Sequence, residues 1–225
     1  MEPKEIKSWE DYYQYFSSLP TNSPKRKEAL EKALDVRKFE IALYWKRTQY
    51  FWAILAATFA GYALLVNTER PSYENYLAQF ALASLGFVFS LGWYLVNRGS
   101  KYWQLNWEKH VDMLENDLMG PLFKITLNRK DFPFWKLSGP YRFSVSKVNQ
   151  FISLYVFLFW FFLWCRHLWA NLRLPIVCQQ IDWTFVLIGI STIAIAISFF
   201  VAGTSGKGDS TVKFFESRPE YREKH

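Results

Sequence analysis

Four apolar blocks dominate the pattern of hydrophobic and polar positions along the chain. Each has about the length of a bilayer-spanning helix, because a helix rises about 1.5 Å per residue and the hydrocarbon core is about 30 Å thick. The third block reaches this length only with its apolar flanks. The pattern therefore predicts an all-α membrane protein with four transmembrane helices, at about 50–66, 76–96, 148–169 and 183–201.

The first two predicted spans continue beyond the membrane as long helices. After Pro24, a residue favoured at the first helical position, no stop signal occurs before Asn67. The second helix turns polar at Arg98 without a break and ends at Gly120. Residues 23–119 are therefore expected to form one long helical hairpin whose membrane halves carry cytoplasmic extensions.

The remaining segments are assigned from their local patterns. Residues 1–22 are expected to form a cytoplasmic N-terminal amphipathic helix, because a capping-box pattern at Ser8 precedes regularly spaced aromatic residues. Prolines interrupt residues 120–145, which predicts a cytoplasmic or interfacial loop. Residues 146–202 then form a second transmembrane hairpin, and the Gly-, Ser- and charge-rich residues 203–225 form a flexible cytoplasmic tail.

The distribution of positive charge predicts the orientation in the membrane. Of the 27 Lys and Arg residues, 24 lie in the N-terminal segment, in the region between the second and third spans and in the tail. By the positive-inside rule these segments, and so both termini, are cytoplasmic. Topology and contact with anionic lipid then account for the net charge of +7, and nucleic acid is not an expected partner.

Residues at the ends of the spans are expected to position the helices. Basic and aromatic side chains prefer the headgroup region, and the anchor candidates are Lys46, Arg47, Trp52, Trp93, Lys101, Trp135 and Arg142. Small residues recur on the first two spans, which predicts close packing with each other or with neighbouring subunits. The third block carries Phe and Trp on every face, which is typical of a lipid-facing helix.

No pattern in the sequence indicates an enzyme. The four apolar blocks contain no Asp or Glu, which disfavours proton-coupled transport. The three His residues lack the spacing of a metal site, so neither a metal nor another cofactor is expected. Cys165 and Cys178 leave two alternatives open: a disulfide on the outer side, or two small buried hydrophobic side chains, of which the second is favoured.

Aromatic, basic and amide residues cluster where the first two helices leave the membrane. The patterns are Arg-Lys-Phe-Glu-Ile at 37–41, Tyr-Trp-Lys-Arg at 44–47, Asn-Arg-Gly-Ser-Lys at 97–101 and Asn-Trp-Glu at 106–108. Over about residues 28–118 they resemble the RipA family of octameric bacterial inner-membrane proteins. The resemblance implies a homo-octamer around a central axis in the bacterial inner membrane, and it provides no catalytic residue. The interface candidates are Tyr44, Trp45, Arg98, Trp103, Asn106, Trp107, Glu108 and His110.

The residues and the resemblance together predict a homo-oligomeric, octamer-like ring. The first functional expectation is a pore or channel for ions or small solutes. The alternative is a non-conducting membrane scaffold, or a signalling or defence subunit, whose cytoplasmic helices recruit a soluble partner. The expected partners are the lipid bilayer, further copies of the chain and, under the alternative, that soluble protein.

Overall fold

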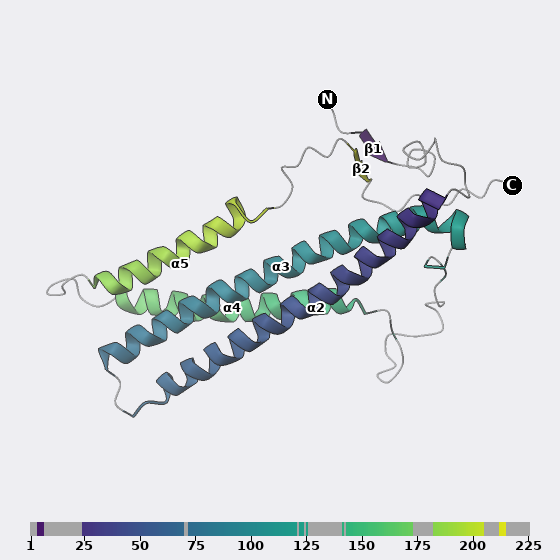
Figure 1. Cartoon of the computed structure of the whole chain (residues 1–225). Coiled ribbons are helices and arrows are strands. Elements are labelled where there is room, and N and C mark those ends of the chain that lie inside the picture. Colours follow the sequence, from purple (N-terminus) through teal and green to yellow (C-terminus); the bar gives the residue numbers. More distant parts are fainter. Residues whose placement is uncertain are drawn as a thin grey trace. The chain divides into compact units, whose positions relative to one another are not determined.

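The fold consists mainly of four long helices (Figure 1). The structure, a computed structural model of the 225-residue chain, describes residues 4–6, 24–69, 72–120, 122–123, 125, 141, 143–172, 182–204 and 212–214. The helices are α2 (Pro24–Val66), α3 (Tyr73–Met119), α4 (Val145–Leu172) and α5 (Trp183–Val201). All four are long and apolar enough to cross a membrane. The predicted membrane-helical character is therefore confirmed.

Local sequence signals explain where these helices begin and end. The Ser72 hydroxyl accepts a hydrogen bond from the backbone N–H of Asn75 at 3.2 Å, which caps the start of α3. The Asp182 carboxylate accepts from the N–H of Thr184 at 2.9 Å and caps α5 in the same way. Gly120 follows the last residue of α3 with a φ of +76°, a left-handed conformation that favours glycine and ends helices.

The first two helices are unbroken and much longer than a membrane is thick. α2 has 43 residues and α3 has 47. At about 1.5 Å per residue, each helix is roughly twice as long as the hydrocarbon core of a bilayer. A bilayer around the apolar part of α2 or α3 therefore leaves about half of that helix outside.

The chain divides into two compact units, and α2 and α3 contribute to both. We call Leu43–Lys101 together with Phe143–Thr204 the apolar unit, and the rest of the chain the charged unit. In the charged unit, the beginning of α2 packs against the end of α3. This small core consists of Leu30, Ala33, Val111, Met113 and Leu114.

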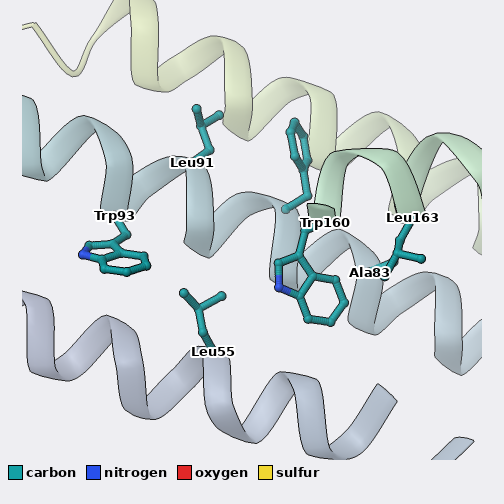
Figure 2. Packing of buried hydrophobic residues seen from close by; sticks show 7 residues of the cluster. Leu55, Ala83, Leu91, Trp93, Trp160 and Leu163 are labelled. Carbon is teal, nitrogen blue, oxygen red and sulfur yellow. The ribbon is translucent and has the colours of Figure 1, made fainter. Parts of the chain in front are cut away.

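The core of the apolar unit is built on α3. Within residues 76–96, α3 buries eight side chains or glycines, whereas α2 buries only Leu55 and Thr58 of its apolar block. Trp160 of α4 is fully buried beside α3, and Figure 2 shows its ring near Leu55 and Ala83. α3 is therefore the central helix of this unit, and α2 leaves most of its apolar surface exposed.

Two short strands depart from the all-α prediction. β1 (Lys4–Ile6) and β2 (Val212–Phe214) pair in parallel, with Lys4 opposite Val212 and Ile6 opposite Phe214. β1 lies in the segment predicted as a helix and β2 in the segment predicted as a flexible tail. Strands of three residues show no readable periodicity, so the local pattern could not indicate them. The amphipathic pattern that begins at Ser8 lies outside the described residues.

Candidate functional site

A buried group of amide and hydroxyl side chains marks the ends of three apolar blocks. Thr48 precedes the block of α2 by two residues, and Asn97 directly follows that of α3. Asn149 precedes the most apolar part of α4 by two residues, and all three side chains are buried. With Tyr44 and Ser153, they form what we call the amide–hydroxyl cluster. The polar residues that flank the apolar blocks of α2, α3 and α4 therefore lie at the same height along the helix axes.

Hydrogen bonds within this cluster connect α2, α3 and α4. Nδ2 of Asn149 donates to the hydroxyl of Tyr44 at 2.7 Å and to Oδ1 of Asn97 at 3.3 Å. Oγ1 of Thr48 donates to the same Asn97 oxygen at 3.4 Å, and Nδ2 of Asn97 donates to Oγ of Ser153 at 3.2 Å. Because an unpaired buried polar group is costly, these bonds favour one alignment of the three helices along their axes.

Basic side chains lie next to the amide–hydroxyl cluster. Nη1 of Arg47 donates to Oγ of the buried Ser100 at 3.0 Å and so joins α2 to α3. Lys46 is exposed and Lys101 is half-buried. These three predicted anchor residues therefore lie just beyond the apolar blocks. Their role as membrane anchors stays a prediction.

A second buried polar group surrounds His167 near the other end of α4. The Tyr62 hydroxyl lies 3.1 Å from Nε2 of His167, and the Tyr76 hydroxyl donates to the His167 carbonyl oxygen at 2.7 Å. The imidazole is 2% exposed and its centroid lies 6.2 Å from that of the Phe80 ring. The group therefore connects α2, α3 and α4 a second time.

The small residues of α2 and α3 differ in their surroundings. On α3, Ala83, Ser84, Gly86 and Ser90 are buried inside the chain. On α2, Gly61 is half-buried, but four small residues at intervals of three and four positions are exposed. They are Ala53, Ala56, Ala57 and Ala60, and we call them the alanine face. Of the two predicted uses of small residues, α3 therefore packs within the chain, whereas α2 presents a smooth apolar surface.

The predicted interface residues differ in their exposure. Trp45 is 38% exposed, Trp103 is 42% exposed, and Arg98 is also exposed. Tyr44 is only 2% exposed and packs inside the chain, where its hydroxyl bonds to Asn149. The sequence predicts Tyr44 at a subunit interface, but a buried side chain has no surface with which to contact a second subunit. The half-buried candidates are Asn106, Trp107, Glu108 and His110.

One predicted membrane anchor is buried as well. Trp93 is 2% exposed, because it lies on the central helix, and Figure 2 shows its indole directed towards the part of α2 that carries Leu55. It therefore cannot reach lipid headgroups. Trp52 on α2 is exposed, and its ring meets that of Trp93 edge-on. The remaining two candidates, Trp135 and Arg142, lie outside the described residues.

Cys165 is a free thiol, so the disulfide alternative with Cys178 is not formed in this structure. Its side chain packs against the buried group of Phe80, Trp164 and Phe185, as a small hydrophobic residue would. Cys178 itself lies outside the described residues. Among the residues that the structure describes, no three His, Cys, Asp or Glu side chains are grouped to hold a metal ion.

Comparison with known families gives one match. A model of the octameric membrane protein family (8xMP) matches residues 27–169. The match confirms the resemblance seen over residues 28–118 and extends it through most of α4, so it includes the whole amide–hydroxyl cluster. No significant match was found among curated proteins or solved structures. The match covers more than half of the residues of the chain, and the chain therefore belongs to the octameric membrane protein family.

Proposed function

We propose that eight copies of the chain assemble into a ring in the bacterial inner membrane and that the ring is a pore for ions or small solutes. The observation that carries this proposal is the exposed alanine face of α2, in a chain whose family is described as octameric. Lipid tails are as apolar as a helix surface, so helices associate in membranes mainly where small side chains permit close contact.

The alanine face has the spacing of a helix–helix interface. Ala53, Ala56, Ala57 and Ala60 recur at intervals that place them on one side of α2. Leu55 lies between them in the sequence and packs in a core with residues of α3 and α4, and Thr58, three positions later, is buried as well. The alanine face is therefore directed away from the core of its own chain. A helix of the next subunit can approach this face closely without displacing large side chains.

The geometry of an eight-membered ring supports the pore. Neighbouring subunits of a closed ring of eight differ by a rotation of about 45° and meet through two different surfaces. With a subunit about two helices wide, roughly 20 Å, the ring encloses an axial opening on the order of 30 Å across. The subunits leave that opening unfilled, so water, lipid or further parts of the chain must occupy it. We propose an aqueous path.

The orientation in the membrane belongs to the same proposal. Of the 27 Lys and Arg residues, 24 lie in segments that the positive-inside rule assigns to the cytoplasm. The ends of α2 and α3 that form the charged unit then extend into the cytoplasm, together with both termini. In this position the charged unit is available to gate the opening.

Ring assembly is tested by enlarging the alanine face. The double variant Ala56→Leu/Ala60→Leu is expected to lose the octamer, because overpacking costs about 1–3 kcal/mol at each interface and the ring contains eight copies of it. Light scattering of the detergent-solubilised particle measures the mass. The matched control is Ala194→Leu, which enlarges an exposed alanine of α5. A monomeric wild-type chain, or an octamer that tolerates both leucines, contradicts the proposed interface.

Conduction is tested separately from assembly. The purified wild-type octamer is expected to produce discrete current steps in planar bilayers, and the Ala56→Leu/Ala60→Leu variant is expected to produce none. The Ala194→Leu control should conduct like the wild type. An intact octamer that remains silent under all applied voltages contradicts the pore while leaving the ring in place.

A second candidate function is a scaffold that recruits a soluble protein. It is favoured by large hydrophobic side chains that are exposed in the charged unit, of which Phe39 and Tyr102 are 60% and 64% exposed. Trp103 and Leu105 are exposed near Tyr102 on α3. Surfaces of this kind often bind other proteins. Under this alternative, gentle purification recovers a stoichiometric soluble partner, and Tyr102→Ser/Trp103→Ser releases it without changing the mass of the membrane particle.

A further inference from the structure

The amide–hydroxyl cluster brings the basic residues of three helices to one level. Because Thr48, Asn97 and Asn149 are joined by hydrogen bonds, the alignment of α2, α3 and α4 along their axes is fixed at this point. Five basic residues lie within four positions of these three, which corresponds to at most about 6 Å of helix. They are Lys46, Arg47, Arg98, Lys101 and Lys147, and we call them the basic collar.

All five residues lie on the same side of the cluster. The apolar blocks begin after Thr48 on α2 and after Asn149 on α4, and the block of α3 ends before Asn97. The basic residues precede the cluster on α2 and α4 and follow it on α3. They therefore lie just outside the apolar part of each helix, where the phosphate groups of a surrounding bilayer are found.

Acidic residues of the apolar unit are far from the basic collar along the chain. The unit contains only Glu69, Glu74 and Asp182, and these are adjacent to the opposite ends of α2, α3 and α5. The segments that carry the collar, residues 43–50, 94–101 and 143–150, contain no Asp or Glu. These three segments of the apolar unit therefore contain five basic residues and no acidic one.

Several collar side chains are available to a ligand. Lys46, Arg98 and Lys147 are exposed, one on each of the three helices. The Arg98 guanidinium lies 5.8 Å from the centre of the Tyr94 ring, which holds it near the helix surface. A ligand that binds at any of these three positions is expected to be anionic and to lie at the height of the headgroups.

We propose that the basic collar is a binding site for the headgroups of anionic phospholipids. A phosphodiester accepts hydrogen bonds from guanidinium and ammonium groups, and a headgroup with net negative charge is attracted by each of them. A zwitterionic headgroup carries its own compensating cation and is attracted much less. The inference goes beyond the proposed pore and does not depend on it, because the collar belongs to a single chain.

The test compares two lipids on the purified full-length protein. Native mass spectrometry of the detergent-solubilised protein, titrated with phosphatidylglycerol or phosphatidylcholine, gives the affinity for each. The wild type is expected to prefer phosphatidylglycerol. Lys46→Gln/Arg98→Gln/Lys147→Gln is expected to weaken that binding by about fivefold per charge, roughly 100-fold in total, with phosphatidylcholine binding unchanged.

Two control variants separate the collar from general effects of charge. Arg166→Gln removes an exposed charge of α4 outside the collar and is expected to bind phosphatidylglycerol like the wild type. Lys46→Arg/Lys147→Arg keeps the charges and should retain the preference. Equal binding of the two lipids by the wild type overturns the proposal, as does a triple variant with unchanged selectivity. Collar-dependent binding of a single-stranded oligonucleotide in place of phosphatidylglycerol would also overturn it.

The same spectra report the proposed ring independently. A monomer with collar-dependent selectivity for phosphatidylglycerol contradicts the ring and supports the lipid site. An octamer without any such selectivity supports the ring and overturns the lipid site. The two proposals can therefore fail separately.

Discussion

Replacing Gly86 by alanine is expected to destabilise the apolar unit by about 3 kcal/mol. A Cβ atom at this position would lie 2.5 Å from both Cε2 and Cε3 of the Trp160 indole, well inside van der Waals contact. Trp160 is fully buried, and its ring centroid lies 4.6 Å from that of Phe59 and 5.6 Å from that of Tyr62, so neighbouring rings oppose its displacement. The measurement is SDS-induced unfolding followed by tryptophan fluorescence.

The same helix provides the control for this substitution. An added Cβ at Gly99 meets nothing within 4 Å, so Gly99→Ala is expected to stabilise α3 by about 0.5–1 kcal/mol through helix propensity alone. In the double variant Gly86→Ala/Trp160→Leu, the smaller leucine makes room for the new methyl group. The double variant should therefore lose less unfolding free energy than the sum of the losses in the two single variants. Strict additivity would contradict the proposed clash.

Replacing Asn97 by leucine is expected to cost about 2–4 kcal/mol. Leucine has a similar volume, so the effect reports lost hydrogen bonds more than a cavity. Thr48, Asn149 and Ser153 each lose a partner, and all three side chains are buried. The same SDS titration measures the cost, and hydrogen exchange of the first turns of α4 should become faster because that helix is held less firmly.

Hydroxyl groups elsewhere in the apolar helices provide the comparison for Asn97. The exposed Ser191 hydroxyl bonds only to the Ile188 carbonyl oxygen of its own helix, at 3.0 Å, so Ser191→Ala should change stability by less than about 0.5 kcal/mol. Adding Asn149→Leu to the Asn97→Leu variant should cost less than Asn149→Leu alone, because both residues belong to one network. Independent, additive costs would show that the cluster is not cooperative.

The ends of the helices could be predicted from the sequence because their signals are local. Pro24 opens α2, Gly120 ends α3, and α5 occupies the same residues, 183–201, as the fourth apolar block. Each signal depends only on residues close together in the sequence. Proline has a fixed φ that suits the first helical position, glycine adopts the left-handed conformation that ends a helix, and an apolar run of membrane length marks a span. The family resemblance was likewise carried by short patterns near the ends of the first two spans.

Contacts between helices could not be predicted in the same way. The local pattern marks Asn149 only as a polar residue near the start of a helix. The Phe and Trp residues on every face of α4 predict a lipid-facing helix, whereas Trp160 is fully buried. Both depend on which faces of α3 and α4 meet, and that is decided by contacts between residues far apart in the chain. One signal was present: Thr48, Asn97 and Asn149 each lie beside the end of an apolar block.

The pairing of β1 with β2 restricts how the chain can be threaded through a membrane. Lys4 and Val212 are neighbours in a hydrogen-bonded ladder, so no bilayer can separate them. The number of crossings between these two residues must therefore be even. Four crossings are an even number. If one of the four apolar helices lay on the membrane surface, the chain would cross three times, which the pairing excludes. Reporter groups inserted next to Lys4 and next to Val212 must consequently lie in the same compartment.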